Sequence, residues 1–298
     1  MTSFPTLLHA FFHHAQTRPD RVALRSKQGA AWRDLSWAGY GARVLAVAAG
    51  LQELGVGAGD RVAILSTNRA EWLIFDLAAL CLGAGTVPIY PSSLSAQVQY
   101  IVEHSECVAV LVEDAEQAEK IRAHRAETPA LRHVIVVDGE ATDAGATSFA
   151  RLEESGAARG ASVLSAIERG VLSLDPRGLA TIVYTSGTTG PPKGAMLSHR
   201  NLMAMGDSLV SVVSAGPDDS SLSFLPLSHI AERLQGEIMA IRVGYTVNMG
   251  EGLPAVPQNL VETEPTILVC VPRLWEKYYA RIRSGLRDAS PLRSKIFD

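Results

Sequence analysis

The 298-residue sequence contains little cysteine and no long apolar run. Its three cysteines, Cys81, Cys107 and Cys270, lie in apolar stretches without C-x-x-C spacing, which is typical of free thiols in a reducing compartment and not of a disulfide framework. The longest apolar run, 77–90, contains two glycines and Pro88 and is too short to cross a bilayer. The N-terminus lacks a cationic region and a small-residue cleavage site, so no secretory signal is predicted. We expect a soluble, cytoplasmic protein, and peripheral association with the inner membrane face stays open.

An excess of positive charge is also absent. The sequence has 27 lysine and arginine residues against 31 aspartate and glutamate residues, a net charge of −4, so nothing indicates nucleic-acid binding. His9 and His13 have the i, i+4 spacing of helical metal ligands, but no acidic or cysteine companion lies near them. We therefore predict no metal-binding residues.

Apolar periodicity alternates between helical segments and short β-branched runs, which predicts βαβ units. We expect an α/β protein with mainly parallel, doubly wound sheets and flanking helices. The predicted strands are 60–65, 85–90, 107–112, 134–137, 179–184, 222–225, 244–248 and 266–270. The predicted helices are 36–54, 68–82, 95–104, 198–213, 229–241, 254–262 and 273–284, with Asn68 as the cap of the second.

The segment 138–170 is rich in small and polar residues, and we interpret it as a surface connection. Phe149 and Leu152 are the apolar residues by which it would dock locally. It would separate a first α/β layer, 1–137, from a second layer, 171–298.

A glycine- and hydroxyl-rich loop, Tyr-Thr-Ser-Gly-Thr-Thr-Gly-Pro-Pro-Lys-Gly at 184–194, directly follows the apolar run 179–184. Glycines let backbone N–H groups face an anion, hydroxyls add donors, and a lysine adds a mobile positive charge. The residues concerned are Thr185, Ser186, Gly187, Thr188, Thr189, Gly190, Lys193 and Gly194. The pattern predicts a loop that binds polyphosphate, and therefore a protein that uses a nucleotide.

Two other interpretations of the loop fit less well. A Walker A loop has its lysine directly after a glycine and a serine or threonine directly after the lysine. Here Lys193 follows two prolines and precedes Gly194. A mobile linker would not usually emerge from an apolar strand and run into a helix start such as Ser198.

The loop and its continuation to Asn201 resemble the phosphate-loop signature of the adenylate-forming (AMP-binding) ligases. Four further stretches are similar to the long-chain acyl-CoA synthetase branch: 64–72, 86–90, 225–233 and 271–277. The resemblance implies the large N-terminal domain of that fold. The later motifs of the family, its hinge and its C-terminal catalytic lysine are absent from the sequence. We therefore expect a partial large domain that lacks the small C-terminal domain and needs a complementary C-terminal half as a partner.

The same resemblance implies an activity with three substrates. A fatty acid and ATP, with Mg²⁺, would give acyl-AMP and pyrophosphate, and the thiol of coenzyme A would then displace AMP. The phosphate-binding positions would be Thr185, Ser186, Gly187, Thr188, Thr189, Gly190 and Lys193. Lys193 would also act in catalysis, with His229 lining the site for the acyl carboxylate and nucleotide. Glu232 and Arg233 would order the helix that walls the acyl channel.

Several alternatives stay open. His229 could be a helix-start residue bound to the backbone, and Glu232 and Arg233, being adjacent, could each pair structurally with other residues. The acid could be activated for transfer to a carrier-protein thiol. The chain could also be a noncatalytic fragment that binds a nucleotide or a partner.

Overall fold

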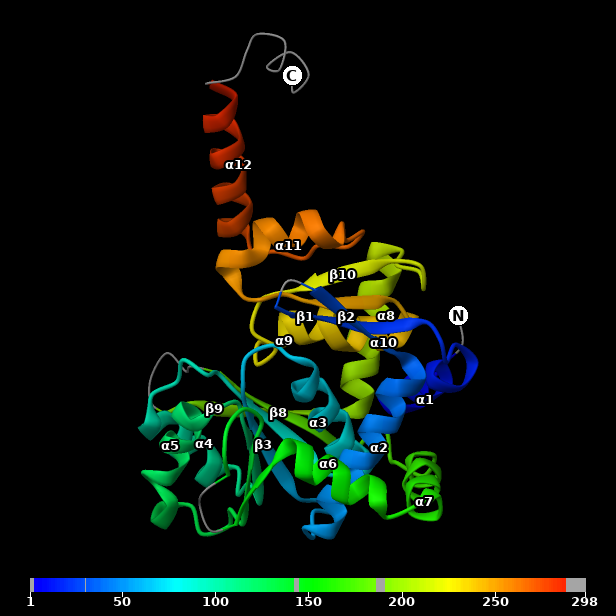
Figure 1. Ribbon diagram of the computed structural model, residues 1–298, viewed down its shortest axis with the longest axis vertical. Coiled ribbons are helices and arrows are strands. Elements are labelled where there is room, and N and C mark those ends of the chain that lie inside the picture. The colour runs from blue at the N-terminus through cyan, green and yellow to red at the C-terminus, as the bar shows by residue number, and fades with distance from the viewer. Residues whose placement is uncertain (1–2, 30, 142–144, 186–190, 288–298) are drawn as a thin grey trace. The chain divides into compact units, whose positions relative to one another are not determined.

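The computed structural model describes residues 3–29, 31–141, 145–185 and 191–287. The chain divides into two units, residues 1–267 and 268–298. The second unit contains one helix in its described part, α12 (Pro272–Arg287). The first unit contains two β-sheets (Figure 1).

The larger sheet has seven strands in the order β7-β6-β5-β3-β4-β8-β9. Neighbouring strands from β7 to β8 are parallel, and β9 is antiparallel to β8. The strands are β3 (Arg61–Leu65), β4 (Gly85–Ile89), β5 (Ala109–Val112), β6 (His133–Val136), β7 (Ala146–Ser148), β8 (Leu179–Thr185) and β9 (Lys193–Ser198). Alternate residues enter two cores: Val62 and Ile64 face one, Ala63 and Leu65 the other. Burial on both faces explains why these strands read as continuous apolar runs.

Helices cover both faces of this sheet. The core that contains Ile64 also takes residues from α2 (Trp37–Glu53), α3 (Ala70–Cys81), α6 (Phe149–Ala158) and α7 (Ala161–Val171). The core that contains Leu65 takes residues from α4 (Ser95–His104) and α5 (Ala115–Arg122), which is followed by the short helix η1 (Arg125–Glu127). The predicted doubly wound α/β architecture is therefore confirmed.

The smaller sheet has the order β10-β11-β1-β2. Its strands are β1 (Val22–Gln28), β2 (Ala31–Ser36), β10 (Ser220–Ser223) and β11 (Thr246–Met249). Its helices are α1 (Leu7–Thr17), α8 (His199–Val213), α9 (Ile230–Arg233), η2 (Leu234–Met239), α10 (Ala240–Val243), η3 (Leu253–Ala255) and α11 (Val256–Thr263). One hydrophobic core contains residues of both sheets and of the helices α1, α2, α3 and α8.

Most predicted elements are present with shifted ends, but several elements differ from the prediction. The helices α1 and α5 were not predicted. The hairpin β1–β2 was not predicted because β2 is largely exposed and lacks an apolar run. The strand β9 occupies residues predicted as loop. At 266–270 the structure has a single bridge, Ile267 with Ser221, in place of a strand, because no continuous pairing follows it.

The segment 138–170 is more structured than the predicted connection. It carries β7, α6 and most of α7, while the docking of Phe149 and Leu152 is confirmed by their burial. A Cβ on Gly156 of α6 would lie 1.8 Å from the carbonyl oxygen of Ala46 in α2, so the two helices cross where only glycine fits.

The predicted division into layers 1–137 and 171–298 is wrong. The strands β1 and β2 join β10 and β11, while β8 and β9 extend the sheet of β3 to β7. Long-range pairing decides sheet membership, and local periodicity does not reveal it.

A buried arginine joins α9 to the larger sheet. Arg233 is 1% exposed and its Nη2 donates to both carboxylate oxygens of Asp76 in α3, at 2.7 and 2.6 Å. Its Nε donates to Glu237 at 2.7 Å and its Nη1 to the hydroxyl of Thr181 in β8 at 2.7 Å. The guanidinium also lies 5.4 Å from the ring centre of Trp72. One side chain therefore links α9 to α3, η2 and β8.

We predict that Arg233→Met lowers the free energy of unfolding of the chain by about 3–5 kcal/mol, because two buried carboxylates lose their cation. Urea unfolding followed by circular dichroism measures this. Arg21→Met is the control: its pair with Asp218 is exposed and should contribute at most about 1 kcal/mol. Equal, small losses in both variants would contradict the structural role of Arg233.

Candidate functional site

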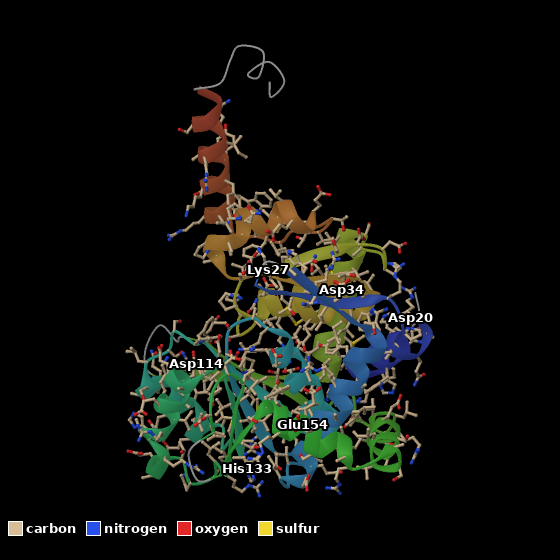
Figure 2. All side chains as sticks on the ribbon, viewed as in Figure 1. Asp20, Lys27, Asp34, Asp114, His133 and Glu154 are labelled. Carbon is tan, nitrogen blue, oxygen red and sulfur yellow. The ribbon has the colours of Figure 1, made fainter. Side chains whose placement is uncertain are left out.

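The carboxyl ends of the parallel strands form one edge of the larger sheet. In Figure 2, Asp114, two residues after the end of β5, marks this edge, and His133, at the start of β6, marks the opposite edge. The helix that follows β3 covers one face of the sheet and the helix that follows β4 covers the other. Adjacent strands whose connections diverge in this way form a topological switch point, where ligands of α/β sheets bind. The strand β8 lies beside β4 and leads into the glycine-rich loop.

The segment 225–229 is docked onto this edge from the smaller sheet's side of the unit. The side chain of Asn68, just after β3, donates to the carbonyl of Leu225 at 2.6 Å and accepts from the N–H of Leu227 at 2.9 Å. The hydroxyl of Ser228 donates to the carbonyl of Ile89, the last residue of β4, at 3.0 Å. Two strand ends therefore fix the backbone that precedes His229.

Asn68 positions the segment 225–229, although it was predicted to cap the helix that follows it. The helix α3 instead begins at Ala70, and no side-chain cap bond forms at its start. The bonding partners of Asn68 lie more than 150 residues further along the chain, so a local pattern could not reveal them.

Polar side chains also tie the turns at this edge together. The ammonium of Lys120 donates to the carbonyls of Pro91 and Ser93, at 2.6 and 3.1 Å, in the turn that follows β4. The backbone N–H and hydroxyl of Thr67, after β3, donate to the carboxylate of Glu113, after β5, at 2.9 and 2.7 Å. These bonds hold the strand ends in a defined arrangement around the switch point.

The described ends of the loop lie opposite each other. Thr185 ends β8, Lys193 begins β9, and the two are paired in register; both are exposed. Ser186, Gly187, Thr188, Thr189 and Gly190 lie outside the described residues. Strand alternation places Thr185 on the same face as Thr181, whose hydroxyl meets Arg233 of α9. Thr185 and Lys193 therefore lie at the carboxyl edge, with Thr185 on the face that α9 covers.

Gly194 has a packing role within β9. A Cβ at this position would lie 2.7 Å from Cγ2 of Ile182 and 3.2 Å from Cζ of Tyr184. The missing side chain lets the ring of Tyr184, its partner in register, lie across β9. Gly194 was predicted to take part in anion binding, whereas the structure gives a steric reason for glycine here.

His229 is the N-cap of α9. Its Nδ1 accepts a hydrogen bond from the N–H of Ala231 at 3.1 Å, and its own N–H donates to the carbonyl of Pro226 at 2.8 Å. The ring is exposed. The interpretation of His229 as a helix-start residue is therefore confirmed, and its role at the acyl carboxylate and nucleotide stays a prediction.

Glu232 and Arg233 have separate surroundings, as the structural interpretation of this pair predicted. Arg233 binds Asp76, Glu237 and Thr181. Glu232 is also 1% exposed, and its burial raises the pKa of the carboxyl to about 7. It therefore carries a proton more readily than an exposed glutamate.

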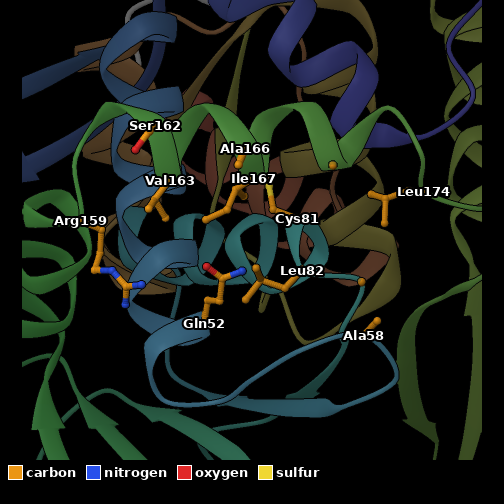
Figure 3. A pocket seen from close by; sticks show the side chains of 12 residues that line it. Gln52, Ala58, Cys81, Leu82, Arg159, Ser162, Val163, Ala166, Ile167 and Leu174 are labelled. Atoms are coloured by element: carbon orange, nitrogen blue, oxygen red, sulfur yellow. The ribbon is translucent and has the colours of Figure 1, made fainter.

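No metal site is built from the residues that the structure describes: among them, no group of three or more histidine, cysteine, aspartate or glutamate side chains could hold an ion. The pocket in Figure 3 lies elsewhere. It is lined by α7 and by the ends of α2 and α3, with Cys81, Gly83 and Arg159 among its residues. Because Gly83 comes just before β4, this pocket is at the amino edge of the sheet and not at the switch point.

We predict that Glu232→Gln changes the pH dependence of stability. A carboxyl with an ordinary value of 4.5 and a folded-state pKa of about 7 binds its proton more tightly in the folded chain. The protonated form stabilises the fold below about pH 4.5, and this stabilisation is lost as the pH rises to about 7. Glutamine mimics the protonated form, so the variant should gain about 2 kcal/mol more over the natural chain at pH 8 than at pH 5.

Urea unfolding at the two pH values measures this difference. The control is Glu154→Gln in α6, where the side chain is exposed and the effect should be the same at both pH values. An equal effect of Glu232→Gln at pH 5 and pH 8 would show that the buried carboxyl does not titrate in this range.

Comparison with known proteins gives a consistent result. The family model described as "AMP-binding enzyme" matches residues 11–295. The long-chain-fatty-acid–CoA ligase FadD15 of Mycobacterium bovis is 36% identical over 291 residues, which are 96% of this chain and 46% of the relative. The peroxisomal long chain acyl-CoA synthetase 7 of Arabidopsis thaliana is 30% identical, over 98% of this chain and 43% of the relative. The chain thus spans less than half the length of these relatives.

Solved structures share the fold. The anthranilate CoA ligase AuaEII in complex with anthranoyl-AMP superposes with a TM-score of 0.77 at 21% identity, over 90% of this chain and 50% of that one. Apo MatB from Rhodopseudomonas palustris superposes with a TM-score of 0.75 at 26% identity, over 97% of this chain and 52% of that one. With a family match along nearly its whole length and the same fold in these ligases, the chain belongs to the AMP-binding enzyme family.

Proposed function

We propose that this chain is the phosphate-loop part of a long-chain fatty acid:CoA ligase. The observation that carries the proposal is the pairing of Thr185 with Lys193 across the β8–β9 hairpin, beside the switch point of the sheet. This arrangement puts a hydroxyl and an ammonium at the two ends of a loop that contains three further hydroxyls. The names of relatives such as FadD15, a long-chain-fatty-acid–CoA ligase, support the choice of acid and acceptor.

The first step of the proposed reaction joins the acid to the nucleotide. A carboxylate oxygen of the fatty acid forms a bond to the α-phosphorus of ATP, the bond from that phosphorus to the bridging oxygen breaks, and pyrophosphate leaves with the electron pair. Negative charge develops on the departing group, so preorganised donors lower the barrier, each by about 2–4 kcal/mol. Lys193 and the backbone N–H groups of the loop would supply that stabilisation, and MatB with ATP bound has a similar fold.

The second step transfers the acyl group. The sulfur of coenzyme A forms a bond to the acyl carbon, the bond from that carbon to the phosphate oxygen breaks, AMP leaves, and the thiol proton passes to solvent. Several relatives carry a CoA ligase name, which favours coenzyme A over a carrier-protein thiol as the acceptor.

Both steps would need more than the residues described. The chain spans less than half of its relatives, and we propose that a C-terminal half like theirs acts together with it in both steps. Mg²⁺ would enter bound to the phosphates of ATP, and no step above is assigned to an ion held by this chain.

Among the helices in the described ranges, none has the length and apolar character that crossing a membrane requires. The proposed location is the cytoplasm, with peripheral contact at the inner membrane face where long-chain acids partition.

Fatty-acid-dependent ATP–pyrophosphate exchange tests the proposal. The purified 298-residue chain is assayed alone and with the C-terminal half of a related ligase. Exchange that requires a long-chain acid, in either form, supports adenylation. No acid-dependent exchange in either form would contradict it.

Lys193→Ala should lower the exchange rate by about 10²-fold or more, because one preorganised donor to the leaving phosphates is lost. The control is Arg151→Ala, which removes the same unit of charge at an exposed position on α6. Exchange is measured under saturating acid in whichever form is active, with unfolding curves to confirm equal folding. An unchanged rate in Lys193→Ala would remove the phosphate-loop assignment.

Two variants distinguish the helix-capping role of His229 from its proposed role in the reaction. His229→Ala loses the acceptor for the N–H of Ala231 and should cost about 1 kcal/mol of stability. His229→Asn keeps a capping oxygen and should restore stability. We expect both variants to slow exchange to a similar extent, because neither has the imidazole ring. Full exchange activity in His229→Asn would mean that the residue only caps the helix.

A further inference from the structure

We propose that Tyr100 and His104 of α4 are positioning residues that hold both ends of the phosphate loop. The hydroxyl of Tyr100 donates to the carbonyl of Pro192 at 3.2 Å. The Nδ1 of His104 lies 2.7 Å from the hydroxyl of Tyr184. Pro192 is the residue just before Lys193, and Tyr184 is the residue just before Thr185. One helix therefore contacts the strand that enters the loop and the segment that leaves it.

The helical spacing makes this double contact possible. Tyr100 and His104 are four residues apart, so they lie on the same face of α4. Their rings are stacked, with centres 5.3 Å apart and an angle of 26° between the planes. Burial raises the pKa of Tyr184 to about 12, so its hydroxyl keeps its proton at neutral pH and can donate to His104. Tyr100 and His104 therefore contact the β8–β9 hairpin from the same face of one helix.

The hairpin needs support at this point. Proline has no N–H group, so neither Pro191 nor Pro192 can donate to β8, and the ladder begins at Lys193. The bond from Tyr100 is to the carbonyl of Pro192, the residue just before the ladder. Among the described strands, β9 is also last in the order of the sheet. The segment that leaves the loop is therefore held by strand pairing with β8 and by the bond from Tyr100 of α4.

Gly194 provides independent support for the contact. Its missing Cβ leaves room for Cζ of Tyr184, which would be 3.2 Å away, and Cζ carries the hydroxyl that meets His104. Gly194 thus leaves room for the ring of Tyr184, and His104 of α4 binds the hydroxyl of that same ring. In the proposed reaction, on which this step rests, a loop held at both ends would lose less entropy when it binds the phosphates of ATP.

Amide hydrogen exchange on the free chain tests the contact without requiring activity. Tyr100→Phe and Tyr184→Phe each remove one hydroxyl with little change in packing. Each should speed exchange in peptides that cover 183–196 by about two- to tenfold, the effect of one ordinary hydrogen bond on local opening. Exchange in peptides from β3 and β5 should be unchanged.

Variants of His104 show whether its ring is the partner. His104→Leu should speed exchange at least as much as Tyr184→Phe, because it removes the same bond and also the stacking on Tyr100. Adding Tyr184→Phe to His104→Leu should cause no further change, because the bond is already lost. His104→Asn can place an amide oxygen near the position of Nδ1 and should recover most of the effect. The control is Tyr245→Phe, which loses a hydroxyl bond of 2.6 Å to the carbonyl of Gln235, away from the loop.

Unchanged exchange in both tyrosine variants, or an equal change in Tyr245→Phe, would overturn the proposal. Titration of each variant with MgATP adds the functional readout: Tyr100→Phe and Tyr184→Phe should bind about two- to tenfold more weakly than the natural chain. If the natural chain binds no MgATP, either alone or with the C-terminal half of a related ligase, the proposed function fails. The exchange data then still decide whether α4 holds the loop.

Discussion

The ion pairs of Arg233 determine where the candidate site can form. They fix α9 against α3 and β8 through directional bonds to Asp76 and Thr181, whereas apolar packing alone would leave more freedom to slide. The helix α9 begins directly after His229, and the preceding segment reaches the ends of β3 and β4. A displaced α9 would carry that segment away from the switch point. The guanidinium is therefore a structural requirement for a site that it does not itself enter.

Two supports of different kinds meet at the carboxyl edge. The segment 225–229 follows β10 of the smaller sheet. It is held by the side chain of Asn68, which follows β3, and by that of Ser228, which precedes His229. The loop of β8 and β9 belongs to the larger sheet and is held from the opposite face by α4. The edge between them is accessible, since Thr185, Lys193 and His229 are all exposed. Rigid surroundings and exposed polar ends are what a loop that binds and releases a polyphosphate requires.

The sequence was sufficient for those parts of the fold whose signal is local. Buried parallel strands such as β3 and β5 are apolar runs, and α2 and α8 have serine caps at their starts, so periodicity and capping locate them. The strand β9 was missed because the two prolines before it and the glycine within it are typical of loops, and only pairing with β8 makes it a strand. The mixed membership of the two sheets depends on contacts between residues about 200 positions apart, such as Leu24 with Val247. The residues of the candidate site differ in the same way. Loop composition alone was enough to predict Thr185 and Lys193. The roles of Asn68, Tyr100 and His104 could not be predicted, because their bonding partners are distant in sequence.

If the glycine-rich loop and the segment before α9 form one nucleotide site, MgATP should protect both from amide hydrogen exchange. Exchange of the natural chain is measured with and without MgATP. We expect slower exchange in two regions that are far apart in sequence, 184–194 and 225–229, and no change in the residues that line the pocket of Figure 3. Protection confined to that pocket, or protection of neither region at saturating MgATP, would show that the two segments do not form one nucleotide site.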